Sequence, residues 1–165
     1  LVPVAAAPAG YPLVSAFFLS IGLFFWAILV TVIFYRLITK PPLEPAMRPT
    51  LVIMLAPPAV SCLAVIAMTG EFTSMALALF AIAVFFVLLL LPQIPSFFRL
   101  PFFPSWWAYT FPTAAFTVAC YQLAKFKGLL SDTMLGLLTA SVTTIVLLVT
   151  SRTLWAIVRG EMASH

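Results

Sequence analysis

Proline recurs at the same spacing in two apolar stretches of the chain. Pro49 is followed eight residues later by Pro57, which Pro58 follows directly, and Pro104 is followed eight residues later by Pro112. The two copies lie 55 residues apart. Proline carries no backbone N–H, so within an α-helix it leaves the carbonyl four residues earlier without its usual donor. The groups that this pattern makes available are therefore backbone carbonyls rather than side chains.

The carbonyls that would lose their donors are those of Ile53, Met54 and Ala108. Eight residues of α-helix rise about 12 Å, which places the second proline of each pair near the middle of a membrane about 30 Å thick. A carbonyl without a donor is costly in lipid, so helices broken at this depth usually face protein or a water-filled path. Broken helices often build a transport route. Prolines that merely kink packed helices are the alternative.

Phe111 directly precedes the second of these breaks and lies on a helical face of small residues. Steps of three or four residues lead from its ring to Ala108, Ala115 and Val118. Small faces usually pack helices closely. The alternative is a narrow pore that one ring closes by steric block and dewetting. We expect Phe111 to act as a gate. The residues expected to line the pore or to kink its helices are Ala56, Pro57, Pro58, Ala108, Pro112, Ala115 and Val118.

Titratable groups are missing from the centres of the apolar stretches, which hold no Asp, Glu, Lys or His. A proton-coupled pump or a membrane protease needs such groups, so passive permeation or facilitated exchange is favoured. Basic flanks bias a path toward anions. Cys62, Cys120 and the final His165 are too few and too scattered for a metal site. We predict no catalytic residue, no metal, no cofactor and no enzyme.

The elements that carry these residues follow from composition. Of 165 residues, 64% are hydrophobic and 7% are charged, whereas a soluble domain carries roughly 25% charged residues. Lipid must therefore surround most of the surface. The net charge of +4 comes from residues that stand singly between apolar runs. That pattern is typical of membrane topology and argues against a nucleic-acid partner.

Five stretches are long and apolar enough to span a bilayer, near 13–36, 49–69, 72–95, 105–125 and 133–155. Their residues do not alternate as barrel strands do. The predicted fold is an all-α integral membrane helical bundle, with one transmembrane domain over 1–165. The apolar opening at 1–7 is typical of the end of an earlier apolar segment, and we expect an N-terminal truncation.

Basic residues divide unequally between the two ends of such a bundle. The start of the chain, the 69–72 turn and the 125–132 loop share one side, with Lys125 and Lys127. Six basic residues occupy the other side: Arg36, Lys40, Arg48, Arg99, Arg152 and Arg159. The second side is therefore expected in the cytoplasm, together with the C-terminus. We expect a multi-pass protein of the cell membrane, specifically a bacterial inner membrane.

Three short motifs carry a resemblance to a known family: RPTL at 48–51, LAPPAV at 55–60 and WWAYTFP at 106–112. The chain resembles the tellurite-resistance/C4-dicarboxylate transporter family, which also contains fungal malate permeases and plant guard-cell slow anion channels. The resemblance implies ten helices in five hairpins with quasi-fivefold symmetry, in which five inner helices line a pore and chains form homotrimers. Phe111 falls on that family's gating phenylalanine.

The resemblance covers only the second half of that fold, helices six to ten. Three of five pore-lining helices are then absent, so we expect either missing N-terminal helices or a second, completing chain. The expected function is an anion channel or carrier for C4-dicarboxylates, tellurite or small inorganic anions. A non-transporting membrane subunit that stabilises a larger complex is the alternative.

Overall fold

The computed structural model describes residues 1–97 and 100–159, and this part of the chain is a helical bundle without strands. In chain order its α-helices and 3-10 helices (η) are α1 (Val2–Ala6), α2 (Pro12–Thr39), η1 (Pro45–Leu55), α3 (Ala56–Thr69), α4 (Ser74–Leu90), η2 (Leu91–Gln93), α5 (Ile94–Phe97), η3 (Pro104–Tyr109), α6 (Thr110–Lys127) and α7 (Asp132–Val158). The predicted all-α membrane bundle is confirmed.

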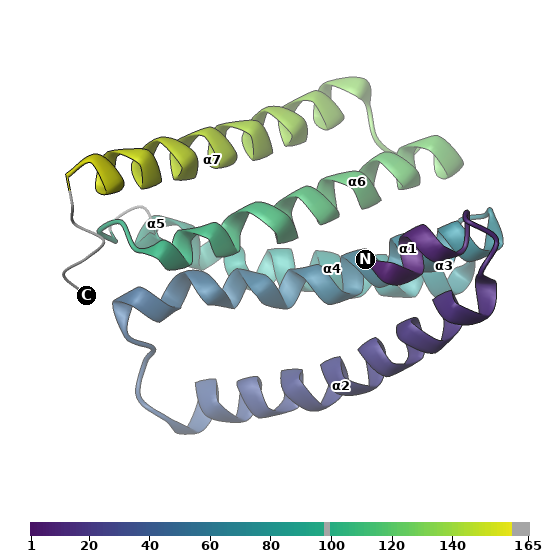
Figure 1. Ribbon diagram of the computed structural model, residues 1–165, viewed down its shortest axis with the longest axis horizontal. Helices are drawn as coiled ribbons and strands as arrows, with labels where there is room; N and C mark the ends of the chain where they lie inside the picture. Colours follow the sequence, from purple (N-terminus) through teal and green to yellow (C-terminus); the bar gives the residue numbers. More distant parts are fainter. Residues whose placement is uncertain (98–99, 160–165) are drawn as a thin grey trace.

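The long helices run side by side, with α2 and α7 at opposite edges and α3, α4 and α6 between them (Figure 1). Helix α3 contacts α1, α2, α4 and α6, and it is the most buried long helix. Helix α2, by contrast, buries only Ser15. Its exposed Phe, Leu and Ile side chains would be untenable over such an area in water, but they suit a lipid surface.

Four helical segments of the described residues are long and apolar enough to cross a membrane: Pro12–Thr39, Pro45–Thr69, Ser74–Gln93 and Asp132–Val158. They correspond to four of the five predicted spans. The predicted span 105–125 is covered by η3 and α6, but it does not meet the same criterion. Threonines, Gln122 and Lys125 make it the most polar of the five. It lies inside the bundle against α3 and α7.

Both proline-containing segments change helix type where a kinked α-helix was expected. Helix η1 becomes α3 at Ala56, whose backbone N–H donates to the carbonyl of Ile53. The prediction that Pro57 leaves the Ile53 carbonyl without a donor was therefore wrong. In a 3-10 helix each carbonyl bonds three residues ahead, so the bond is made before Pro57 is reached. Pro57 then lies in the first turn of α3, where its missing N–H is not needed.

The second segment makes the same change at Thr110, where η3 becomes α6. The backbone N–H of Thr110 donates to Trp107, again three residues back. The hydroxyl of Thr113 donates to the carbonyl of Tyr109 over 2.6 Å. Threonine hydroxyls that bond back in this way supply donors around a proline in lipid. The break at Pro112 is thus a transition between two helix types, with bonds to the carbonyls of Trp107 and Tyr109 on either side of Ala108.

The α3–α4 and α6–α7 hairpins close with the same chemistry. Gly70 and Gly128 follow α3 and α6 in the left-handed conformation, with φ of 72° and 63°, and each N–H caps its helix. Three residues later the side chains of Thr73 and Ser131 accept from the first turns of α4 and α7. The weak repeat in the proline spacing therefore extends to whole hairpins.

Small side chains form the contacts among α3, α4 and α6. Ala59, Ala83 and Ala119 are fully buried, which lets the helix backbones approach closely in the absence of a hydrophobic driving force. Larger rings fill the space between them, and Phe80 of α4 stacks on Phe116 of α6 with centroids 5.7 Å apart. The core of the bundle is thus the region around α3.

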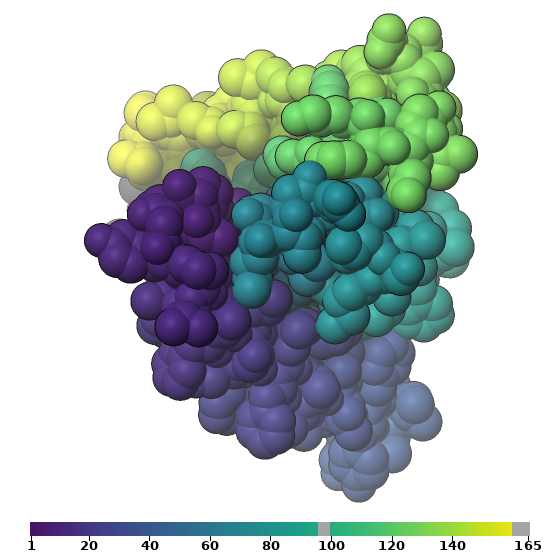
Figure 2. Space-filling view, turned by 90° about the vertical axis from the view of Figure 1, so that its right-hand side faces the viewer, coloured from purple at the N-terminus to yellow at the C-terminus, as the bar shows by residue number. Residues whose placement is uncertain are grey.

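The described basic residues lie at the two ends of the bundle in the two groups that the sequence predicted. The start of α2 and the turns at 70–73 and 128–131 share one end of the molecule, which Figure 2 views directly. That end carries Lys125 and Lys127 in the last turn of α6. The opposite end holds the end of α2, the start of η1 and the end of α7, with the five described basic residues of the larger group. Arg99 lies outside the described residues.

Candidate functional site

Phe111 is the second residue of α6 and its ring is exposed, with 46% of its surface accessible. Val118, two turns further along the same helix, is 47% exposed. Ala115, predicted on the same face, is only 7% exposed. It packs instead into a cluster formed by Met54, Leu55, Ala59, Ala83 and Phe86. The structure therefore keeps Phe111 and Val118 on an open face and turns Ala115 into the core.

The predicted kink residues lie where the segment η1–α3 meets the segment η3–α6. Ala56, Pro58 and Pro112 are buried, while Pro57 and Ala108 are half-buried. Helices η1 and η3 contact one another, and so do α3 and α6. These residues therefore pack the starts of two parallel helices together. Of the predicted set, Phe111 and Val118 present the most exposed side chains.

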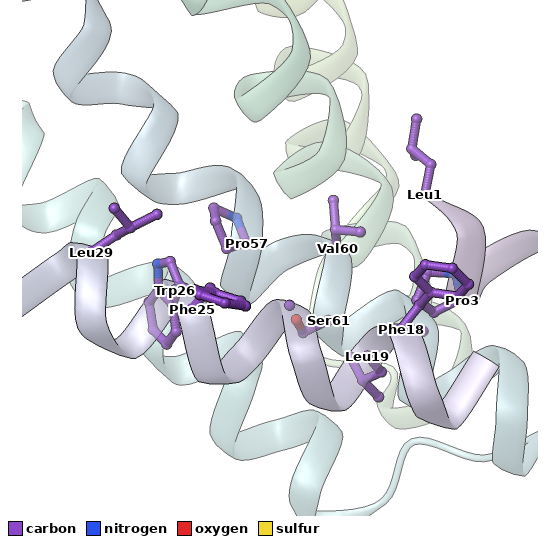
Figure 3. Close-up of a pocket in the computed structure, with 12 residues that line it drawn as sticks. Leu1, Pro3, Phe18, Leu19, Phe25, Trp26, Leu29, Pro57, Val60 and Ser61 are labelled. Atoms are coloured by element: carbon purple, nitrogen blue, oxygen red, sulfur yellow. The ribbon is translucent and has the colours of Figure 1, made fainter. Parts of the chain in front are cut away.

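A groove of about 320 Å³ lies beside Pro57, between α1, α2 and α3 (Figure 3). Helix α3 contributes Pro57 and Ser61, and α2 faces them with Phe25 and Trp26. The Trp26 indole nitrogen is buried without a hydrogen-bond partner. The remaining lining is apolar, so the groove suits hydrocarbon side chains better than a hydrated ion.

A second groove of about 400 Å³ lies between α6 and α7. Its lining alternates small, hydroxyl and aliphatic side chains: Ala114, Thr117, Val118, Tyr121, Thr139, Val142 and Thr143. The sequence pattern did not predict this surface. Val118 is the only predicted site residue that reaches it.

Two hydrogen bonds connect α7 to the segment formed by η3 and α6, and the residues of one of them line this groove. The Trp107 indole N–H donates to the Thr153 hydroxyl over 3.1 Å, and Tyr121 and Thr139 are joined through their hydroxyls over 2.9 Å. Sequence reasoning missed both pairs. The sequence did hold one sign of them, because Trp107 and Tyr121 lie 14 residues apart and so do Thr139 and Thr153.

The chemistry available at this site is steric and electrostatic. Among residues 1–97 and 100–159 no three His, Cys, Asp or Glu side chains gather in a way that holds a metal ion. The exposed Phe111 ring at the break in an inner helix can block a passage and exclude water from it.

Comparisons with known proteins place the chain in a family. The family model described as SLAC1, voltage-dependent anion channel, matches residues 1–158. Over 138 residues the chain is 31% identical to the S-type anion channel SLAH3 of Arabidopsis thaliana, an alignment that covers 82% of this chain. Over 120 residues it is 27% identical to the guard cell S-type anion channel SLAC1 of the same plant, covering 73% of this chain.

The aligned part spans 22% of the length of each of these two relatives. No solved structure gives a significant match. The family match nevertheless extends over nearly all of the described helices, including both inner segments and the hairpins that follow them. The chain belongs to the SLAC1 family of voltage-dependent anion channels.

Proposed function

We propose that this chain supplies two inner helices, α3 and α6, to a membrane pathway for small anions, and that Phe111 closes this pathway at rest. The observation that carries the proposal is the exposed Phe111 ring at the break between η3 and α6, in a chain of an anion-channel family. An aromatic ring of this kind blocks both the anion and the water that would hydrate it.

The charge distribution supports an anion as the permeant species. The end of the bundle that holds the start of η1 and the end of α7 carries Arg36, Lys40, Arg48, Arg152 and Arg159 against Glu44. Such an excess of positive charge raises the local concentration of anions at the mouth of a path. The substrates that we propose are C4-dicarboxylates, tellurite or small inorganic anions, moved without a chemical reaction.

The proposed assembly follows from the number of inner helices. Two such helices cannot enclose a pore, so further helices from the same polypeptide or from a completing chain close the ring. We propose that the complete units form a homotrimer in a cell membrane, a bacterial inner membrane, with the basic end and the C-terminus in the cytoplasm.

Flux measurements on the intact gene product test the proposal. Reconstituted into liposomes, it should release chloride, nitrate, malate or tellurite down a gradient faster than protein-free vesicles do. Release of at least one of these anions is the expected result. Folded, inserted protein that releases none of them contradicts an anion pathway.

The second candidate function is a non-transporting subunit that stabilises a larger membrane complex. The burial of Ala115 in the core favours this alternative, because the small residues of α6 then serve helix packing. It predicts that the chain co-purifies with a larger membrane protein and that no variant of it alters anion flux.

A further inference from the structure

The two hydrogen bonds between α7 and the η3–α6 segment share one chemical design. Thr139 donates its only hydroxyl proton to the Leu135 carbonyl over 2.9 Å, so the proton in the bond between Tyr121 and Thr139 comes from Tyr121. Thr153 likewise donates to the Val149 carbonyl over 2.8 Å while it accepts from the indole of Trp107. In both cases a threonine relays a hydrogen bond from an aromatic side chain to its own helix.

The two relays also share one register. Trp107 and Tyr121 are separated by 14 residues along one segment, and Thr153 and Thr139 by 14 residues along the antiparallel partner. Fourteen residues make nearly four turns of α-helix and rise about 21 Å. The carbonyls at their ends belong to Leu135 and Val149, which are two of the three buried residues of α7.

The contact between α6 and α7 is partly open. A groove of about 400 Å³ separates the two helices there, and Tyr121 and Thr139 of one relay line it together with Thr117, Val118, Val142 and Thr143. The relative position of the two helices therefore depends on the relays and on the buried residues beside them. Helix α7 has no internal proline and runs unbroken from Asp132 to Val158.

The segment that α7 holds is the broken one. One relay begins at Trp107 in η3, before the change of helix type, and the other at Tyr121 in α6, after it. Phe111 lies between them, four residues beyond Trp107. Because the Phe111 ring is exposed, its place is set by the backbone that carries it more than by neighbouring side chains.

We propose that the relays Trp107–Thr153 and Tyr121–Thr139 position the Phe111 ring. Through them the unbroken helix α7 holds η3 and α6 in a fixed relative orientation across the break between them. This inference rests on the proposed gating role of Phe111. Cutting either relay lets the segment bend at the break, and the ring then leaves its blocking position more often. The four residues are positioning residues that act through Phe111.

The test compares resting anion currents of the intact gene product with the single substitutions Tyr121→Phe and Thr139→Val. Tyr121→Phe removes only the bond between Tyr121 and Thr139, whereas Thr139→Val also removes the bond from Thr139 to the Leu135 carbonyl. Both substitutions nearly keep the size of the side chain. A single hydrogen bond between helices in a membrane is worth about 0.6 kcal/mol, so we expect roughly a threefold rise in the ratio of conducting to blocked channels. Thr143→Val is the matched control, because the Thr143 hydroxyl lines the same groove but donates only to its own helix, at Thr139.

The decisive arm repeats Tyr121→Phe in a Phe111→Ala background. A positioning role predicts that Tyr121→Phe has no further effect on the current there, since the ring is gone. An equal change in both backgrounds, or a change as large in Thr143→Val, overturns the positioning role. If Phe111→Ala alone leaves the resting current unaltered, the gate itself is refuted. If it raises the current while Tyr121→Phe does not, only the positioning role is overturned.

Amide hydrogen exchange gives a readout that does not depend on flux. In Tyr121→Phe, exchange of the α6 amides around 110–114 should accelerate about threefold relative to Thr143→Val, because opening at the break becomes easier. Unaltered exchange in this stretch contradicts the positioning role of α7, whatever the currents show.

Discussion

The Ser105 hydroxyl donates a hydrogen bond to the backbone carbonyl of Ala46 over 2.5 Å. The bond joins the beginnings of the two proline-containing segments, because Ala46 lies in η1 and Ser105 in η3. The two 3-10 helices thereby start at the same level of the bundle, and the α-helices that follow them run parallel. One hydroxyl thus aligns two copies of the repeated unit.

Ser105→Ala should therefore lower the stability of the protein in detergent by about 1 kcal/mol. The Ala46 carbonyl would lose its donor at a half-buried position, while the helix propensity around it hardly changes. The thermal unfolding midpoint measures the effect. Ser141→Ala is the control, because the Ser141 hydroxyl bonds only to the Leu137 carbonyl of its own helix. Equal midpoints for the two variants would contradict an aligning role for Ser105.

The contact between α3 and α6 offers a second prediction on packing. Ala119 is fully buried, so Ala119→Leu should force the helices apart and cost about 1–3 kcal/mol. Ala140 on α7 is exposed, and Ala140→Leu should leave the unfolding midpoint within about one degree of the wild-type value, because its side chain meets lipid. A tolerated Ala119→Leu would mean that the inner helices are less tightly packed than the structure describes.

The sequence predicted the helices well because the length of an apolar run can be read without any knowledge of the fold. Four of the predicted spans agree with described helices within about four residues. The repeat of prolines was also informative, since it marks two equivalent inner segments. What the spacing could not reveal was the helix type, because the pattern of 3-10 bonds depends on donors such as the N–H of Ala56.

The candidate site was predicted less completely. A helical wheel places Ala115 beside Phe111, but it cannot tell which side of α6 faces α3 and α4, so it missed that Ala115 is buried. The relays from Trp107 and Tyr121 were missed for the same reason. Each needs a partner on another helix, and one sequence gives no register between α6 and α7.

Topology is open to direct chemical labelling. A cysteine introduced at Lys40 should react with an impermeant maleimide only from the cytoplasmic side, and one at Glu71 only from the opposite side, since the two positions lie at opposite ends of the bundle. The excess of basic residues at the Lys40 end gives the orientation. Cys62 and Cys120 are buried and give a low background. Reaction of both new cysteines from one side would contradict the arrangement of spans.

Pro112→Ala tests whether the change of helix type matters for transport. The substitution adds a backbone N–H that can donate to the Ala108 carbonyl, so α6 should extend backward into η3 and turn the residues before it. We expect a folded protein with altered anion conductance. Pro8→Ala, outside the inner segments, is the control. Conductance that stays at the wild-type value in Pro112→Ala would make the break a feature of packing alone.

Phe111→Ala is the most direct test of the proposed gate. The substitution removes the ring and adds no charge, so resting anion conductance should rise strongly while the selectivity among anions persists. Phe111→Leu should give a smaller rise, since Leu still fills part of the neck. Val118→Ala is a useful comparison because Val118 is equally exposed on α6 but lies two turns from the break. Its conductance should change much less.

If Phe111 served packing instead, Phe111→Ala should lower stability and give no gain in current. The exposure of its side chain distinguishes this role from that of a gate. A fully buried Phe costs about 3–5 kcal/mol when it is cut back to Ala, but the Phe111 ring is 46% exposed, so the loss of stability should be smaller than that range. Currents at matched surface expression, measured together with unfolding midpoints, decide the question. A large drop in midpoint with an unaltered or reduced current would remove Phe111 from the gate, whereas a raised current at nearly constant stability would establish it there.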